Sequence, residues 1–249
     1  MPRSSRGRTA VRLDANVDLV GGGRLGAGLS NAYDSNVYLL RGADGAWLAD
    51  TGSGLDQQVL LARVREALGG LPLRGAVLTH AHADHAGGAA GLAAQGATIV
   101  AGAHTAQLVR AADPGPLGLD AALRAGIYPP DYRFVPCPGV LTPDEADLGP
   151  LRALPTPGHS ADHTAYLFTA GGTTYACTGD LLFSRGRIVL PGAEDADVQE
   201  LRRSLVRLRD ARPDVLLPGH GTPVMADASW HIEQALAAFD LGRLPASFT

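Results

Sequence analysis

The sequence predicts an α/β protein with one large domain. The chain has 249 residues, 45% of them hydrophobic, which is enough to bury a core of its own. Short apolar runs, typical of strands, alternate with longer segments that have the apolar spacing of amphipathic helices. Several of the short runs also end close to a histidine or an aspartate. Periodicity therefore indicates the class α/β and places polar side chains near the ends of strands.

In the first half of the chain, apolar runs separated by turn-forming residues predict a series of strands. These strands are expected at residues 11–20, 36–40, 46–49, 75–79 and 97–101, with helices at 55–68, 86–95 and 104–112. Residues 1–12 carry four arginines but no apolar segment, so we expect a disordered basic tail before a single domain at 13–249. The glycine-rich stretch 21–28 lacks a strand–glycine–helix fingerprint and is expected to be a connection that borders the site.

The segment at residues 113–131 is rich in proline, glycine and leucine and interrupts the alternation of strands and helices. A loop of this length in a compact domain is usually functional or mobile. We expect a lid on the substrate side, and an excursion on the surface is the alternative. Beyond this segment, strands are expected at residues 132–135, 151–154, 164–168, 173–176 and 214–217, with helices at 195–208 and 226–241.

Four potential metal ligands lie within six residues, in the order His80, His82, Asp84 and His85. Because side chains alternate in an extended segment, His80 and His82 point the same way and can hold one metal ion. Asp84 and His85 come where the chain turns into the next helix, and they can face a second ion. Imidazole and carboxylate ligands together suit zinc or iron. This cluster favours a metal site over a polar surface loop.

The motif resembles that of the metallo-β-lactamase superfamily of dinuclear metal hydrolases. That family adds a third histidine for the first metal, a bridging aspartate, and a last histidine for the second metal. His159, Asp180 and His220 follow in this order, and each comes directly after a glycine. The resemblance extends over about residues 36–222. It implies a four-layer αβ/βα sandwich of two mixed β-sheets, with the metals at one edge.

The resemblance also implies a role for each candidate ligand. The first ion would be held by His80, His82 and His159, and the second by Asp84, His85 and His220, with Asp180 bridging both. The expected cofactors are two divalent metal ions, with Zn²⁺ first and Fe or Mn as alternatives. In such a site a hydroxide that bridges the metals attacks an acyl carbonyl. Asp84 and Asp180 are the expected catalytic residues, and Asp84 would also manage protons.

Four further residues near the motifs have two interpretations each. The resemblance implies that Asp50 hydrogen-bonds a ligand histidine, and a turn-capping aspartate is the alternative. His163 is expected to brace the loop of His159, although it could instead contact the substrate. We expect His104 to be a solvated residue at a helix start and Cys177 to be a small buried strand residue, and for both a metal ligand is the alternative.

The residues around Asp180 narrow the reactions that the resemblance implies. The run 178–184 looks like glyoxalase II and related thioesterases. The commonest zinc β-lactamases have a cysteine in place of Asp180, and the quorum-quenching lactonases have a tyrosine shortly after it, where this chain has Leu181, Leu182 and Phe183. We therefore expect a glyoxalase II-like thioesterase or acyl hydrolase, with a lactonase or β-lactamase-like hydrolase as the alternative. Because only 29 residues follow His220, the longer helical tail that binds glutathione in glyoxalase II is not expected.

A different class shares the motif. Persulfide dioxygenases bind one iron through two histidines and an aspartate, which would be His80, His159 and Asp180 here. The complete set of seven ligands favours two metals instead.

Composition limits the partners and the location that we expect. The formal net charge of −4 and the pI near 6.0 offer no basic face for nucleic acid. No apolar run approaches the length of a membrane span. Two cysteines, Cys137 and Cys177, do not make a disulfide framework, which favours a reducing cytoplasm. The expected partner is a small-molecule acyl substrate, with no nucleic acid and no membrane, and a homodimer is possible.

Overall fold

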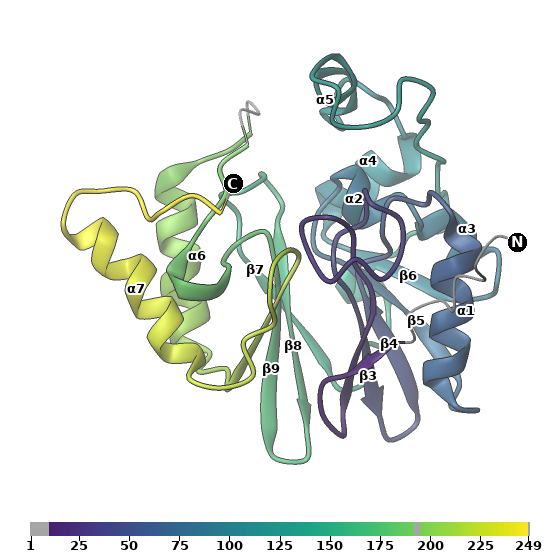
Figure 1. The fold of residues 1–249 in the computed structure, drawn as a ribbon, viewed down its shortest axis with the longest axis horizontal. Helices are drawn as coiled ribbons and strands as arrows, with labels where there is room; N and C mark the ends of the chain where they lie inside the picture. Colours follow the sequence, from purple (N-terminus) through teal and green to yellow (C-terminus); the bar gives the residue numbers. More distant parts are fainter. Residues whose placement is uncertain (1–9, 192–194, 249) are drawn as a thin grey trace, which may run out of the picture.

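The computed structural model describes residues 10–191 and 195–248. Its centre consists of two sheets that face each other, with helices on the outer side of each (Figure 1). The helices α6 and α7 cover one sheet, and α1 to α4 lie over the other. This arrangement confirms the predicted sandwich with two mixed β-sheets.

The first sheet has six strands in the order β1-β2-β3-β4-β5-β6. Their bounds are β1 Val11–Arg12, β2 Val17–Gly21, β3 Val37–Gly42, β4 Gly45–Ala49, β5 Leu73–Leu78 and β6 Thr98–Ala101. Strands β1 to β4 pair antiparallel, whereas β4, β5 and β6 pair parallel. The parallel part brings the carboxyl ends of β4 and β5 side by side, and both ends carry candidate site residues.

The second sheet has four strands in the order β10-β9-β8-β7. They are β7 Leu151–Pro155, β8 Thr164–Ala170, β9 Thr173–Gly179 and β10 Val215–Pro218. Strands β7, β8 and β9 pair antiparallel, and β10 is parallel to β9. The parallel pair places the ends of β9 and β10 together, and each end leads into a candidate ligand.

Side chains alternate between two cores along the strands, as the pleat requires. In β3, Tyr38 and Leu40 pack between the sheets, whereas Val37 and Leu39 pack against the helices. Tyr166, Phe168, Tyr175 and Cys177 of the second sheet meet the first sheet in the shared central core. Because both faces of most central strands are covered, these strands are apolar throughout and alternate little in sequence.

Seven α-helices are described, five of them in the first half of the chain. They are α1 Gln57–Leu68, α2 Ala83–Ala86, α3 Ala89–Ala93, α4 Ala103–Ala111, α5 Leu119–Arg124, α6 Val198–Asp210 and α7 Ala228–Asp240. Two 3₁₀ turns lie at Pro143–Glu145 and Ser184–Gly186. Among the described residues, no helix has the length and apolar character needed to cross a membrane.

The expected helix at residues 86–95 is wrong in its bounds, because the structure has two short helices there, α2 at Ala83–Ala86 and α3 at Ala89–Ala93. The break is at Gly87 and Gly88, where the chain packs closely against residues 51–53. A Cβ on Gly88 would lie 2.2 Å from the carbonyl oxygen of Thr51, and one on Gly87 2.2 Å from that of Ser53. Glycine is required here to seat the ligand-bearing turn on the end of β4.

Three further expectations need correction. The strand expected at residues 132–135 does not form. Tyr132 and Phe134 are buried in the core between the first sheet and its helices, so their alternation reflects packing without a partner strand. Residues 1–9 of the expected tail lie outside the described residues, but Val11 and Arg12 pair with β2 and belong to the sheet edge. In addition, the single strand expected at residues 11–20 is two antiparallel strands, β1 and β2. The remaining helices and strands lie within a few residues of their expected positions.

Candidate metal centre

The candidate ligands all follow the ends of strands, and they come from both sheets. The loop with His80 and His82 follows β5, which ends at Leu78. In the second sheet, His159 follows β7, Asp180 comes directly after β9, and His220 follows β10. The rigid sheets thus position a site on loops at their edges.

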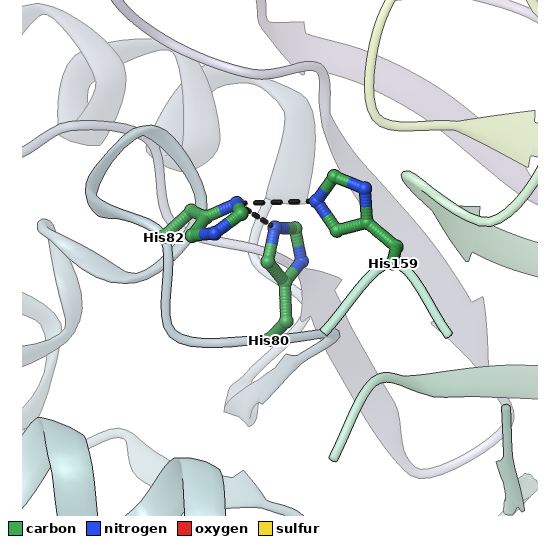
Figure 2. Close-up of side chains that lie close together, drawn as sticks. All are labelled: His80, His82 and His159. Carbon is green, nitrogen blue, oxygen red and sulfur yellow. Dashed lines mark hydrogen bonds between the residues drawn. The ribbon is translucent and has the colours of Figure 1, made fainter. Parts of the chain in front are cut away.

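The first group consists of His80, His82 and His159 (Figure 2). Nε2 of His80 lies 2.8 Å from Nδ1 of His82, and Nε2 of His159 lies 3.1 Å from the same Nδ1. These three nitrogens lie within 4.8 Å of one another, so the group could hold one metal ion. The sequence prediction that His80 and His82 point the same way agrees with this geometry.

Outer hydrogen bonds determine which ring nitrogen of each histidine carries its proton. The carbonyl of Val189 can only accept, so Nδ1 of His159 donates to it across 3.0 Å. The hydroxyl of Thr79 lies 3.0 Å from a carboxylate oxygen of Asp50 and donates to it. That hydroxyl can therefore accept from Nδ1 of His80, 3.0 Å away. Nε2 of both His80 and His159 is left with its lone pair directed at the group, as a metal ligand requires.

The second group consists of Asp84, His85 and His220. Oδ2 of Asp84 lies 3.1 Å from Nε2 of His220 and 3.5 Å from Nε2 of His85. Nδ1 of His85 donates to Oδ2 of Asp50 across 2.8 Å, which leaves Nε2 of His85 to face the group. Asp50 thus contacts a candidate ligand directly, and the expectation that it hydrogen-bonds a ligand histidine is confirmed.

Asp180 lies between the two groups. Its Oδ1 is 3.3 Å from Nε2 of His85, and its Oδ2 is 3.6 Å from Nε2 of both His159 and His220. A third possible donor set joins His80, His85 and Asp180. One carboxylate therefore approaches histidines of both groups, which is the placement that a bridging ligand needs.

The donor set fits metal ions. Nε2 of His85 and Oδ1 of Asp180 are fully buried and lie 3.3 Å apart, but neither atom makes a hydrogen bond. Buried polar atoms are nearly always satisfied, so two unsatisfied atoms at one place indicate a ligand. Nitrogen and oxygen donors in this mixture suit zinc or iron. The same atoms would complete the coordination of a cation placed between the two groups.

The histidines of the first group are favoured in their neutral form. Burial lowers the pKa of His80 well below its usual value, and the neighbouring His85, His82 and His159 lower it further. The pKa of His82 falls to about 4, mainly through burial and then through His159. Burial also lowers the pKa of His159. Neutral imidazole is the form that binds metal, so this group needs little proton release when an ion binds.

The second group is organised by charge. Burial alone would lower the pKa of His220, but Asp180 and Asp84 raise it to about 9. Asp84, Asp180 and Asp50 likewise raise the pKa of His85 in spite of its burial. Burial would raise the pKa of Asp180, whereas His220 and His85 hold it well below its usual range. The group is thus a buried network of opposite charges in which a cation would replace protons.

The remaining expectations can be compared with the structure. His163 is fully buried. Its Nδ1 lies 2.9 Å from the hydroxyl of Thr156, and its Nε2 accepts from the backbone N–H of Asp180 at 3.2 Å. Its bonds to Thr156 and Ser160 brace the loop of His159 as expected, and its bond to Asp180 was not expected. His104 is exposed in the first turn of α4, and Cys177 is buried in β9, so both expectations for these residues are confirmed.

Two contacts at the site have no signal in the sequence motifs. The hydroxyl of Tyr128, in the 113–131 segment, donates to Oδ1 of Asp84 at 3.0 Å and accepts from the Asp84 backbone N–H at 3.1 Å. Phe248 stacks on Phe183 with ring centroids 4.4 Å apart and lies 6.1 Å from the ring of His220. For Tyr128, the only indication in the sequence of a place at the site was the apolar and aromatic composition of the proline-rich segment around it.

A small cavity of about 50 Å³ opens beside the second group. Asp84 and His220 form one wall, and Ile127 and Tyr128 of the 113–131 segment form another. The segment therefore borders the candidate metal centre, although its helix α5 lies farther out, beyond α4 in Figure 1.

The sequence model of the metallo-beta-lactamase superfamily matches residues 31–220, which include every candidate ligand. The chain belongs to the metallo-beta-lactamase superfamily. This fold implies the binding of divalent metal, for which the two groups are the candidate sites. Curated relatives that match the chain include proteins named hydroxyacylglutathione hydrolase and thioesterase.

Two relatives illustrate the kind of hydrolase that the chain resembles. A hydroxyacylglutathione hydrolase of Hahella chejuensis is 30% identical over 181 residues, which cover 71% of this chain and 57% of that protein. Thioesterase pkgB of Emericella nidulans is 30% identical over 206 residues, which cover 82% of this chain and 49% of the relative. The chain thus spans about half the length of these curated relatives.

Solved structures agree on the fold. A metallo-beta-lactamase of Cronobacter sakazakii with a HARLDQ motif superposes with a TM-score of 0.67 at 22% identity, covering 94% of this chain and 97% of that one. TTHA1623, crystallised in a di-iron-bound form, superposes with a TM-score of 0.61 at 30% identity, covering 77% of this chain and 89% of that one. The first likeness concerns the fold alone.

Proposed function

We propose that the chain is a dinuclear metal-dependent acyl hydrolase of the glyoxalase II-like kind, acting on thioesters of small-molecule acids. The observation that carries this proposal is the donor set, in which Asp180 lies between a three-histidine group and the group of Asp84, His85 and His220. Relatives named hydroxyacylglutathione hydrolase and thioesterase support the acyl substrate.

The protein's contribution is to hold the donors in the right form and place. Bound divalent ions would supply a water of lowered pKa and would polarise the carbonyl of the substrate. Thr79, Val189 and Asp50 fix the tautomers of His80, His159 and His85, respectively. Oδ2 of Asp84 faces the histidines, while Tyr128 holds Oδ1. We assign Asp84 a second role in moving protons at the reacting water or the leaving thiol.

Several features of the site support a thioester over the alternative substrates. The second group, with its charged side chains, can stabilise a thiolate as it leaves. A thiolate is a good leaving group, so no additional acid is needed to protonate it. The residues after Asp180 are Leu181, Leu182 and Phe183, all fully buried, so they offer no hydroxyl to a lactone oxygen. We propose zinc as the metal, with iron as the alternative because TTHA1623 binds two irons.

The proposal is tested by metal analysis followed by a matched panel of substrates. Purified protein is loaded with Zn²⁺, Fe²⁺ or Mn²⁺, and the metal content per chain is measured. Each form is then assayed with a thioester, a lactone and a β-lactam, with His82→Ala as the control for contaminating hydrolases. We expect two metals per chain and a kcat/KM for the thioester at least about a hundredfold above those for the other two.

Two outcomes would contradict the proposal. Turnover of the lactone or the β-lactam alone would keep the dinuclear hydrolase but change its substrate. One tightly bound iron per chain, with O₂ consumption in the presence of a persulfide, would replace hydrolysis by the dioxygenase reaction.

A further inference from the structure

The cavity beside the second group has a third wall, which comes from the glycine-rich loop after β2. Arg24 and Tyr33 lie on this wall and line the same cavity as Asp84 and His220. Arg24 is the one basic side chain that is not a candidate ligand among those lining this cavity. The loop therefore places a cation a short distance from the proposed reaction centre.

Backbone hydrogen bonds fix this loop relative to the ligand His220. The N–H of Arg24 donates to the carbonyl of Ala32 at 3.0 Å, and the N–H of Gly23 donates to that of Asp34 at 2.8 Å. Directly after His220, the N–H of Gly221 donates to the carbonyl of Leu25 at 2.7 Å. A Cβ on Gly23 would lie 2.4 Å from the Ala32 carbonyl oxygen, so only glycine permits this closure.

The guanidinium of Arg24 forms no ion pair with a protein carboxylate in the described part of the chain. Its guanidinium lies over the ring of Tyr33, 5.2 Å from the centroid, which orients it without neutralising it. The nearest acid along the loop, Asp34, is buried and accepts from Ser30, from the N–H of Asn31, and from the N–H and hydroxyl of Ser53. In the described part of the chain, no ion pair joins Arg24 to an aspartate or glutamate.

We propose that Arg24 binds a carboxylate on the substrate, so that the site prefers acyl substrates that carry a negative charge near the scissile carbonyl. This inference rests on the proposed hydrolase function and names its substrate class. A guanidinium binds a planar carboxylate through two parallel hydrogen bonds, and a cavity of about 50 Å³ accepts a group of that size. Leu25, Ala32 and Ile127 add apolar surface to the cavity, beside the side chains of Asp34, Asp84 and His220.

The test uses pairs of thioesters that differ only in charge. The first pair places the charge on the thiol, as the acetyl thioesters of 3-mercaptopropionate and 3-mercaptopropionamide. The second pair places it on the acyl group, as thioesters of adipic acid and of its monoamide. The variants are Arg24→Gln and Arg24→Lys. Arg124→Gln is the matched control, because this arginine is exposed on α5 outside the cavity and its loss changes the net charge equally.

We expect Arg24→Gln to raise KM about tenfold for the carboxylate member of at least one pair, with kcat little changed. The amide members should respond to neither variant, and Arg24→Lys should keep part of the preference. The pair that responds identifies the side of the substrate that faces the loop. Because Arg24 is exposed, the effect should shrink at high salt. A carboxylate preference that persists in Arg24→Gln, or is lost equally in Arg124→Gln, would overturn the inference.

A binding measurement separates this inference from the proposed reaction. Thioether analogues of the same pairs cannot be hydrolysed, and their dissociation constants are measured by calorimetry with metal-loaded wild type and Arg24→Gln. Tighter binding of the carboxylate analogue, lost in Arg24→Gln, supports the inference even if no thioester is turned over, in which case only the proposed function fails. Equal binding of both analogues by wild type refutes the role of Arg24.

Discussion

The two halves of the candidate metal centre are built on different principles. The first group, His80, His82 and His159, contains imidazoles alone, and burial keeps them neutral. In the second group, Asp84 lies against His85 and His220, whose pKa values are raised. In the first group, three imidazole lone pairs point at one another and need a cation to stabilise them. In the second group, carboxylates and protonated histidines can stabilise one another by opposite charge. The comparison teaches that the first group needs a bound metal ion to hold its side chains together. The second group can keep its arrangement without metal, as a buried ion-pair network.

The largest effects are expected where the two groups meet, at Asp180. Asp180→Asn keeps the volume but removes the charge near His85, His159 and His220, so both groups should lose metal. His82→Ala and His220→Ala should each remove about one metal per chain. We expect all three variants to lose at least about a thousandfold in kcat/KM with an unchanged circular dichroism spectrum. Elemental analysis distinguishes them, and normal turnover by either Asp180→Asn or His82→Ala would refute the ligand assignment.

A smaller effect is expected from the residues that orient the ligands. Asp50→Asn replaces the acceptor of the His85 proton, whereas Thr79→Val removes the hydroxyl beside His80 and leaves Asp50 in contact with His85. Loss of such outer partners typically lowers metal affinity about 10–100-fold. Competition with a chromophoric chelator should show that Thr79→Val weakens one of two sites and that Asp50→Asn weakens both, since Asp50 also accepts from Thr79. Identical affinity profiles for the two variants would contradict the division into two groups.

The two groups should also give the metal-free protein opposite pH dependences of stability. Below about pH 6.5 the unfolded chain takes up protons that the buried first group resists, because its pKa values are lowered, that of His82 to about 4. Stability should therefore fall as the pH drops from about 6.5 to 4. The raised pKa of His220, about 9, contributes stability that is complete below about 6.5 and disappears as the pH rises through 9. Thermal unfolding of the apoprotein should show a maximum in Tm near pH 6.5, with a loss of a few degrees on each side.

Variants test each side of that maximum separately. His82→Ala should flatten the acid side, and His220→Ala should flatten the alkaline side. If both variants change Tm on the same side of the pH maximum, the first group is not neutral and the second not charged in the way proposed here.

The smallest effect is expected from the segment at residues 113–131, whose Tyr128 contacts Asp84 of the second group. Replacing residues 116–125 by a short turn removes α5 but retains Tyr128 and its bond to Asp84. If the segment is a lid, KM should rise a few-fold for large acyl substrates and little for small esters, with the metal content retained. Steady-state kinetics on an acyl chain-length series checks this, and equal treatment of large and small substrates would make the segment a surface excursion.

The fold was predictable to the extent that periodicity marks buried elements. Strands β3 to β6 and β7 to β10 lie within a few residues of the expected positions, because each is a continuous apolar run between turns. Two of the errors have physical causes that no local pattern shows. Tyr132 and Phe134 alternate with polar residues because their side chains are buried in the core, although the segment pairs with no strand. Gly87 and Gly88 interrupt the expected helix because the chain there packs against residues 51–53.

The site was predictable for the residues whose chemistry is rare and whose spacing is fixed. The histidine cluster pointed to His80, His82, Asp84 and His85. The resemblance to the metallo-β-lactamase superfamily pointed to the other three candidate ligands and to Asp50 at the end of β4. Tyr128 and Arg24 were not found as site residues, because tyrosines and arginines are common on surfaces. Their position depends on how a loop closes, through bonds such as that between Gly221 and Leu25. Sequence patterns identify donors, while the walls around them depend on tertiary contacts.

The origin of the donors in both sheets has a consequence for how the protein assembles. His80 and His220 are 140 positions apart, so closing the site requires long-range contacts that form slowly and late. Each half nevertheless prepares its own donors: Asp50 and Thr79 hold His85 and His80, while Val189 and His163 hold His159 and the turn at Asp180. Bound metal ions would then link the donors of the two sheets. Metal release during denaturation would therefore coincide with separation of the two sheets.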